Sequence, residues 1–228
     1  MSIAANLARV KERIAAAALR SGRSPESVRL VGVTKTVDPP RVELAVQAGL
    51  EILGENYVQE ARDKIRRFQG RVRWHFIGRL QSNKAKHAVQ LFDLIHTVDS
   101  LRLAEELHRR AGALGLVVPV LIQVNLAAEA TKGGVRLDEA RPLIREVAGL
   151  DHLHIRGLMT MPPYFDDPER VRPYFRRLRV LSEEIAALGL PGVEMRELSM
   201  GMSGDFEAAV EEGATLVRVG TAVFGTRP

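Results

Sequence analysis

A closed (β/α)8 barrel, the TIM barrel, is predicted by three features of this 228-residue sequence. Eight short runs rich in β-branched residues alternate with amphipathic helical stretches, the connections between them are short, and no Pro- or Gly-rich linker divides the chain. Alternating strands and helices form a parallel sheet with right-handed crossovers, and eight strands in about 250 residues are typical of a barrel. An open doubly wound sheet is the alternative, because a strand count does not prove closure. We expect one domain over residues 1–228.

The order of elements begins with an extra N-terminal helix over about 2–20, whose apolar residues recur at helical spacing and which Ser21-Gly22 ends. The eight predicted strands cover 29–34, 51–53, 73–77, 94–97, 117–124, 154–157, 194–198 and 215–219. The predicted helices that follow them cover 39–48, 56–67, 82–91, 100–114, 137–148, 168–188 and 204–212. In a barrel the chemistry lies in the βα loops at the carboxyl ends of the strands, so these ends hold the candidate residues.

Composition excludes several classes of protein. Hydrophobic residues make up 46% and charged residues 27%, as in ordinary globular proteins. The chain has no cysteine, which excludes disulfides and cysteine-ligated metals, and we expect no metal site. There is no apolar run of about 18 residues and no secretory signal, so we expect no membrane association and a cytoplasmic protein. No arm or additional apolar helix suggests an oligomer, and we expect a monomer.

The net charge of +5 raises the question of nucleic acid. The arginines are scattered among acidic residues, and the densest stretches, 62–73 and 170–179, have the pattern of solvated amphipathic helices. No aromatic stacking platform accompanies them, so we expect no nucleic-acid partner. The charge favours small anionic ligands instead.

Lys35 ends the first predicted strand, and it is one of only six lysines in the chain. A charged residue at a strand end is often simply solvated. In a barrel mouth, however, low-dielectric walls and neighbouring cations favour the neutral, nucleophilic amine that a Schiff base requires.

Two further candidates follow the second and third strands. Asn56 either caps the next helix or directs its amide toward a ligand. Trp74 and Phe76 have the alternation of packed core residues, which places His75 on the opposite side of the strand, toward the barrel interior or toward the helices. A histidine in such a position is more often a satisfied interior residue than a catalytic one.

The ends of the last two strands favour an anion. The segment Ser199-Met200-Gly201-Met202-Ser203-Gly204-Asp205 directly precedes a helix, and its hydroxyls and free backbone N–H groups are typical of phosphate sites. Ser203 or Asp205 can also serve as an N-cap. The last strand ends in Gly220-Thr221, and barrels often hold phosphate in these two loops. Arg218 lies on the same strand face as Gly220, where it either forms a buried ion pair with a carboxylate such as Glu197 or presents a fixed cation to a ligand.

A ligand with both a carbonyl group and a phosphate matches these features. Pyridoxal 5'-phosphate (PLP) would condense with Lys35 and dock its phosphate in the last two loops. A phosphosugar on a Schiff-base aldolase shares both groups. Arg218 favours PLP, because an arginine is a suitable partner for a pyridine nitrogen.

At this point the sequence resembles the pyridoxal-phosphate homeostasis family over nearly its whole length, from Val31 to Gly225. The resemblance rests on motifs in the same order: Val33-Thr34-Lys35-Thr36, Gly54 to Glu60, Trp74 to Gly78, Leu80 to Lys84, Asn125 with Glu129, Lys132 and Gly134, Gly157 to Met161, Leu198 to Asp205, and Val217 to Gly225. The family is similar in fold to the N-terminal barrel of bacterial alanine racemase.

The resemblance implies a role for each matching residue. Lys35 would hold PLP covalently as a Schiff base, and Arg218 would face the pyridine nitrogen. Asn56 and His75 would line the ring side. Ser199, Ser203, Gly220 and Thr221 would hold the phosphate, with the backbone of Met200 and Gly201 nearby.

Binding without strong turnover is the expected activity. Racemisation needs a second acid–base group on the opposite face of the cofactor, which in the related racemases is a tyrosine from a separate domain. The sequence given ends at Pro228, and we expect no such domain; Tyr57, Tyr164 and Tyr174 have no evident claim to that role. We therefore expect no catalytic residues and a part in intracellular vitamin B6 homeostasis, with PLP-dependent apo-enzymes as candidate acceptors. The alternative is a small PLP-dependent racemase or a Schiff-base aldolase acting on a phosphorylated substrate.

Overall fold

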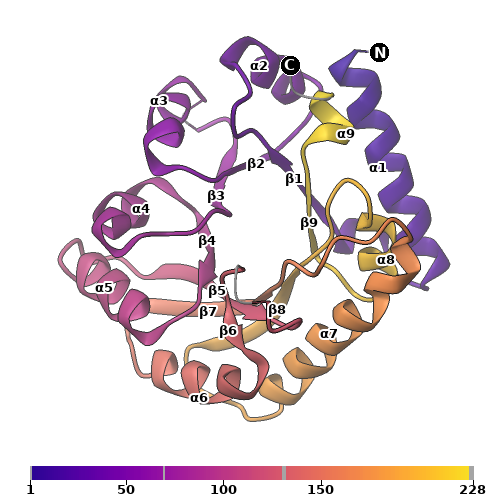
Figure 1. Cartoon of the computed structure of the whole chain (residues 1–228). Coiled ribbons are helices and arrows are strands. Elements are labelled where there is room, and N and C mark those ends of the chain that lie inside the picture. The colour runs from indigo at the N-terminus through magenta and orange to yellow at the C-terminus, as the bar shows by residue number, and fades with distance from the viewer. Residues whose placement is uncertain (1, 69, 130–131, 226–228) are drawn as a thin grey trace.

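The computed structural model describes residues 2–68, 70–129 and 132–225 and forms a ring of parallel strands enclosed by helices (Figure 1). Eight strands form the ring in the order β4-β3-β2-β1-β9-β8-β7-β5, and pairing of β4 with β5 closes it. The predicted closed barrel is therefore confirmed over the open sheet.

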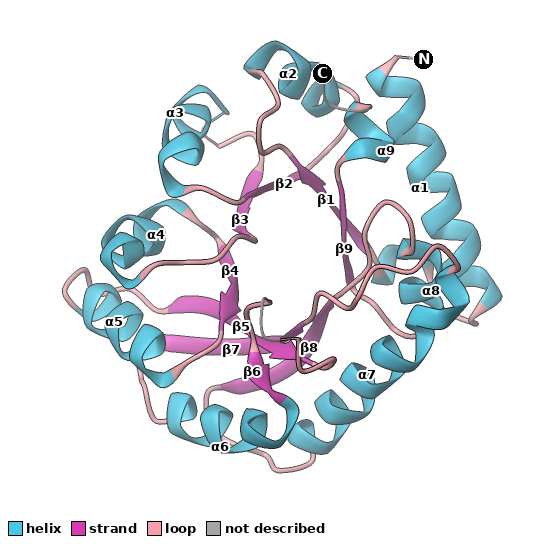
Figure 2. Cartoon of the chain, viewed as in Figure 1, coloured by secondary structure: helices cyan, strands magenta, loops and turns pink. Residues whose placement is uncertain are grey.

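Each of the eight predicted strands overlaps one strand of the ring, drawn in magenta in Figure 2. They are β1 (Arg29–Val33), β2 (Ile52–Glu55), β3 (Arg73–Phe76), β4 (Leu94–Val98), β5 (Val118–Asn125), β7 (Leu153–Met159), β8 (Val193–Ser199) and β9 (Leu216–Val219). An unpredicted strand, β6 (Val135–Arg136), pairs with the end of β5 outside the ring order. Two residues are too short a run to show strand periodicity in a sequence.

The helices surround the ring. They are α1 (Ile3–Arg20), α2 (Pro39–Gln47), α3 (Val58–Phe68), α4 (Ala85–Leu91), α5 (Leu101–Gly112), α6 (Leu137–Ala148), α7 (Arg172–Ala186), α8 (Phe206–Glu211) and α9 (Thr221–Phe224). The predicted helices over 82–91 and 168–188 both begin as 3-10 turns, at Ser82–Lys84 and Pro168–Val171. The short α9 is an addition to the predicted elements.

The N-terminal helix α1 lies outside the ring, against α8 and α9 (Figure 1). Ser2 precedes it as the N-cap, and the Ser2 side chain accepts a hydrogen bond from the backbone N–H of Ala5 at 3.2 Å. Its buried Leu7, Val10 and Ile14 recur at helical spacing and join the core. The helix therefore covers the seam where the last strand meets the first.

Two separate apolar clusters make up the core. The larger one lies between the strands and the helices, and the smaller one consists of Val31, Ile52, Leu94, Leu121, Met159 and Leu216. Because side chains alternate along a strand, the residues two positions beyond Leu94 and Leu216 face the same way as these, and they are His96 and Arg218. The interior of the barrel therefore changes from an apolar layer to a polar one toward the carboxyl ends of the strands.

Candidate functional site

Five consecutive strands of the ring, in the order β3-β2-β1-β9-β8, carry the residues predicted to bind a ligand. Lys35 lies two residues beyond the end of β1, and Asn56 directly follows β2. Ser199 is the last residue of β8, and Gly220 directly follows β9. The parallel arrangement brings these ends to one edge of the sheet, so the structure gathers the predicted residues on one side of the barrel mouth.

A chain of four buried polar side chains crosses the interior from β9 to β3. The Arg218 guanidinium donates from Nη1 to Ser199 Oγ at 2.5 Å, and Ser199 Oγ lies 2.8 Å from His96 Nδ1. His96 Nε2 lies 2.9 Å from His75 Nδ1. His75 thus faces the barrel interior, which decides between the two orientations left open by the sequence, while Trp74 and Phe76 pack in the outer core as predicted.

A guanidinium only donates hydrogen bonds, so an assignment in which each group donates to the next can be written from Arg218 to His75. Ser199 Oγ accepts from Arg218, so its own proton is available to His96 Nδ1. His96 then carries its proton on Nε2 and donates to His75 Nδ1. This assignment satisfies every link with both histidines neutral, which matters because unpaired buried polar groups are costly.

Burial keeps the histidines neutral. It lowers the pKa of His75 to about 3, with Arg29 and Arg73 acting in the same direction. Burial also lowers the pKa of the fully buried His96, and the charges nearby, on Arg218 among others, lower it further. Neither imidazole carries a charge at neutral pH.

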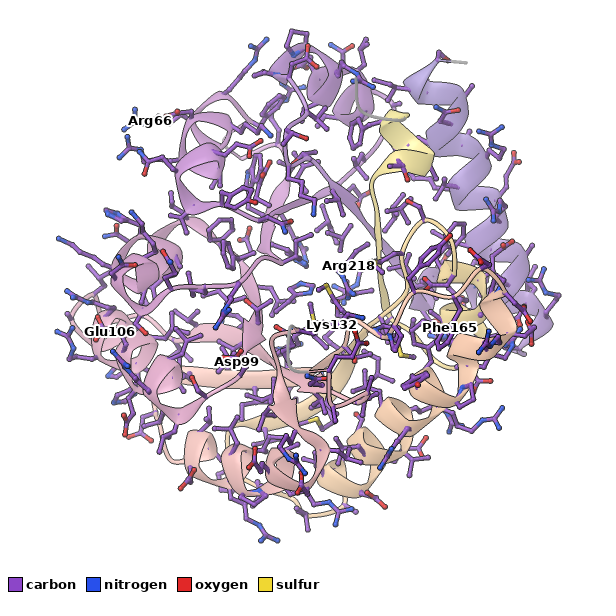
Figure 3. The ribbon with its side chains drawn as sticks, in the orientation of Figure 1. Arg66, Asp99, Glu106, Lys132, Phe165 and Arg218 are labelled. Carbon is purple, nitrogen blue, oxygen red and sulfur yellow. The ribbon has the colours of Figure 1, made fainter. Side chains whose placement is uncertain are left out.

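Arg218 is a fixed cation inside the ring of strands (Figure 3). It is 3% exposed, and its Nη2 donates to the Thr160 carbonyl at 2.9 Å. Burial lowers the pKa of Arg218 to about 10, opposed by the nearby Asp205, so the side chain stays charged at neutral pH. Glu197 pairs with Arg29 and accepts from Thr215 Oγ1 at 2.7 Å. The proposed ion pair of Glu197 with Arg218 is therefore not formed among the described residues.

The loops after β8 and β9 are joined by backbone and side-chain hydrogen bonds. The Arg218 N–H donates to the Gly201 carbonyl at 3.0 Å, and the Ala222 N–H donates to Ser203 Oγ at 3.4 Å. Gly201 has φ +91°, and a Cβ on it would lie 2.5 Å from the Ala209 side chain, so the loop can run this close to α8 only with glycine. Together these contacts hold the loops beside Arg218.

The two candidate caps of α8 take other roles. Asp205 precedes the helix without a side-chain cap hydrogen bond, and its Oδ1 instead accepts from the Met202 N–H at 2.6 Å. Burial raises the pKa of this carboxyl, and the Met202 N–H and Arg218 oppose that shift. Ser203 Oγ accepts a hydrogen bond from the Ala222 N–H in α9. Thr221, the first residue of α9, is exposed.

Asn56 does not cap the next helix, because α3 begins two residues later, at Val58. Its Oδ1 atom is buried and accepts no hydrogen bond from the described residues. Gly78 lies against the Asn56 backbone so closely that a Cβ on Gly78 would meet the Asn56 carbonyl oxygen at 2.2 Å. The Asn56 backbone is therefore closely packed against Gly78.

Several residues of the site were missed in the sequence. His96 is a polar residue within an apolar strand, the same signal that drew attention to His75, but only the stagger of β3 against β4 brings the two rings together. Buried Glu55 on β2 and Lys64 on α3, with Glu60, form an ionic cluster between the strands and the helix layer.

No group of three or more potential metal ligands occurs in the described part of the chain, and no helix there is long and apolar enough to cross a membrane.

Comparison with known proteins places the chain among relatives of similar length. The family model for the alanine racemase N-terminal domain matches residues 3–228. Curated proteins named pyridoxal phosphate homeostasis protein match at 45% identity in Aquifex aeolicus, covering 100% of this chain and 99% of the relative, and at 44% in Escherichia coli K12, covering 99% and 97%.

Solved structures agree. PipY of Synechococcus elongatus with PLP bound superposes with a TM-score of 0.83 at 39% identity, covering 95% of this chain and 100% of PipY. An alanine racemase of Clostridium difficile superposes with a TM-score of 0.76 at 17% identity over 98% of this chain and 57% of the racemase, which shows a common fold.

Proposed function

Because the chain belongs to the pyridoxal phosphate homeostasis family, with the fold of the alanine racemase N-terminal domain, we propose that it binds PLP through Lys35 and acts in PLP homeostasis. The observation that carries the proposal is the arrangement of a lysine, a buried arginine and two joined loops around one side of the barrel mouth. PipY, a relative solved with PLP bound, supports the same ligand. We take residues 1–228 to act as one domain.

The residues present fit this cofactor. When bound, PLP supplies an aldehyde that forms a C=N bond to an amine with loss of water, and an aromatic ring that withdraws electrons. The Lys35 amine is the nucleophile for that linkage. Arg218 provides the cation for the ring nitrogen, and the buried Asn56 Oδ1 provides an acceptor without a partner among the described residues.

The joined loops provide the phosphate site. Ser203, Gly220 and Thr221, with the backbone of Met200 and Gly201, lie where the ends of β8 and β9 meet. The Ser199 hydroxyl is engaged by Arg218 and His96. We keep Ser199 in the proposed phosphate site, where the same hydroxyl would also orient Arg218.

The same geometry supports holding the cofactor without strong turnover. Arg218 cannot accept a proton, and a cation beside the ring nitrogen opposes its protonation, which weakens the electron withdrawal that carbanion chemistry needs. His75 is a poor base, because burial lowers its pKa to about 3 and its Nδ1 lies 2.9 Å from His96 Nε2. Tyr57 and Tyr164 are 61% and 82% exposed, and Tyr174 on α7 stacks against the ring of Phe165. The protein would therefore store PLP and release it to apo-enzymes, with racemisation or aldol cleavage disfavoured.

Titration of the apo-protein with PLP tests the proposal. We expect a visible Schiff-base absorption band that survives dialysis in the wild type and disappears in Lys35→Ala. Lys86→Ala on the exposed face of α4 is the matched control and retains the band. Amino acids added to the loaded protein should not be turned over steadily. Steady racemisation by pure protein would overturn the storage function, and a stable band in Lys35→Ala would overturn the assignment of Lys35.

A further inference from the structure

The segment that carries Lys35 is a tight turn in a conformation unusual for its sequence. The Val37 N–H donates to the Thr34 carbonyl at 3.0 Å, which closes a turn with Lys35 and Thr36 at its centre. Thr36 has φ +60°. A turn with positive φ at this third position is normally built with glycine, and a β-branched residue there is strained.

Two side chains of α3 hold the peptide units on both sides of the Lys35 Cα atom. Lys64 Nζ donates to the Thr34 carbonyl, which is the oxygen of the peptide before Lys35. The Thr36 N–H, which belongs to the peptide after Lys35, donates to Glu60 Oε1 at 2.7 Å. Since the two peptide planes next to a Cα determine its backbone dihedrals, these contacts fix the direction in which the Lys35 side chain leaves the chain.

The holding groups are themselves anchored. Lys64 is 5% exposed, and its Nζ also donates to Glu60 Oε1 at 2.7 Å and to Glu55 Oε1 at 2.8 Å. The three donors of the ammonium are thus all used. Glu55 is fully buried and accepts from Thr34 Oγ1 at 2.6 Å. Glu60 and Lys64 lie one helical turn apart on α3, a spacing that often means only a weak surface pair; here the pair is placed against the β1–α2 loop.

We propose that Glu60 and Lys64 are positioning residues for Lys35: they stabilise the strained turn at Thr36 and thereby aim the amine into the barrel mouth. The inference rests on the proposed function in taking Lys35 as the attachment residue for PLP. It adds that the reactivity of Lys35 depends on a buried ionic cluster in the helix layer, outside the ring of strands.

The test compares rates of Schiff-base formation after PLP is mixed with apo-protein. Glu60→Ala removes the acceptor of the Thr36 N–H, and we expect formation to be about tenfold slower, since small misplacements of a reacting group cost factors of this size. Asp63→Ala on the exposed face of the same helix makes the same change in charge and leaves the rate unchanged. Glu60→Gln keeps an oxygen acceptor for the Thr36 N–H and should recover most of the rate.

A second substitution separates positioning from other effects of Glu60. Thr36→Gly places at the turn the residue that its conformation favours. In a Thr36→Gly background, Glu60→Ala should therefore slow Schiff-base formation much less than it does in the wild type. The rate at which Lys35 is acylated in the apo-protein, measured relative to exposed Lys86 by mass spectrometry, should rank the variants in the same order as the rate of Schiff-base formation. If Glu60→Ala does not fold, Glu60→Asp replaces it in both the wild-type and the Thr36→Gly backgrounds. Its shorter side chain withdraws the carboxylate from the Thr36 N–H.

The outcomes are distinguishable. A wild-type rate in Glu60→Ala, or an equal loss in the wild-type and the Thr36→Gly backgrounds, would overturn the positioning role while leaving Lys35 as the attachment residue. A wild-type protein that forms no Schiff base at all would instead overturn the proposed function.

Discussion

Acidification to pH 5 should destabilise the protein through its buried histidine pair, and Asn in place of His75 isolates the effect. His75 has a pKa of about 3 in the folded chain, against an ordinary value of 6.5, chiefly because it is buried. Below pH 6.5 the unfolded chain takes up a proton that folded His75 refuses. The free energy of unfolding therefore falls as the pH is lowered from 6.5 toward 3.

The expected size follows from the two pKa values. At pH 5, about 1.5 units below the ordinary pKa of 6.5, the imidazole is protonated in the unfolded chain and neutral in the folded one. At about 1.4 kcal/mol per unit, His75 alone therefore lowers the free energy of unfolding by about 2 kcal/mol between pH 7.5 and pH 5. His96 acts in the same direction, because its pKa is also lowered by burial. His75→Asn removes one titrating group but keeps a polar atom near Nδ1 to face His96.

Urea unfolding at pH 7.5 and pH 5, followed by circular dichroism, measures the effect. The loss of stability between the two pH values should be about 2 kcal/mol smaller in His75→Asn than in the wild type. His87→Asn, on the exposed face of α4, is the control and should leave the loss unchanged. If wild type and His75→Asn lost the same stability on acidification, the lowered pKa of the buried, neutral His75 would be refuted.

Two further substitutions test the loops and the cation. Gly201→Ala should destabilise the protein by about 2 kcal/mol or more and weaken PLP binding, because Gly201 has φ +91° and a Cβ there would meet Ala209. Gly204→Ala is the control and should have little effect, because open space surrounds the new Cβ. Equal losses of stability in both variants would count against a tightly held loop. Ser199→Ala should lower the free energy of unfolding, measured in urea, by about 3 kcal/mol, because it leaves Arg218 Nη1 and His96 Nδ1 without this partner. The same substitution should shift the absorption maximum of bound PLP. An unchanged spectrum would mean that Ser199 does not orient Arg218.

The sequence predicted the eight barrel strands because β-branched runs and short connections are local signals. The gathering of Lys35, Asn56, Ser199 and Arg218 also followed from sequence, since parallel strands place their carboxyl ends at one edge. What it could not supply were contacts that depend on stagger between strands. His96 meets His75 only because β4 is offset against β3, and the pairing of His75 with Leu94 sets that offset.

The cluster around Lys64 shows a second kind of limit. Glu60 and Lys64 are four residues apart on a predicted helix, a spacing typical of solvated pairs, and nothing in the pattern marks Lys64 as buried. Burial here comes from the packing of α3 over the ends of β1 and β2. Likewise, the positive φ of Thr36 has no sequence signal, since threonine is not the residue expected there.

The most direct measurement of the central claim is borohydride reduction of the PLP-loaded protein, followed by peptide mapping with mass spectrometry. Reduction makes the lysine linkage permanent and marks the attachment residue. The account predicts one molecule of cofactor per chain, on Lys35. Modification spread over the exposed lysines, or concentrated at another lysine with Lys35 unmodified, would contradict it.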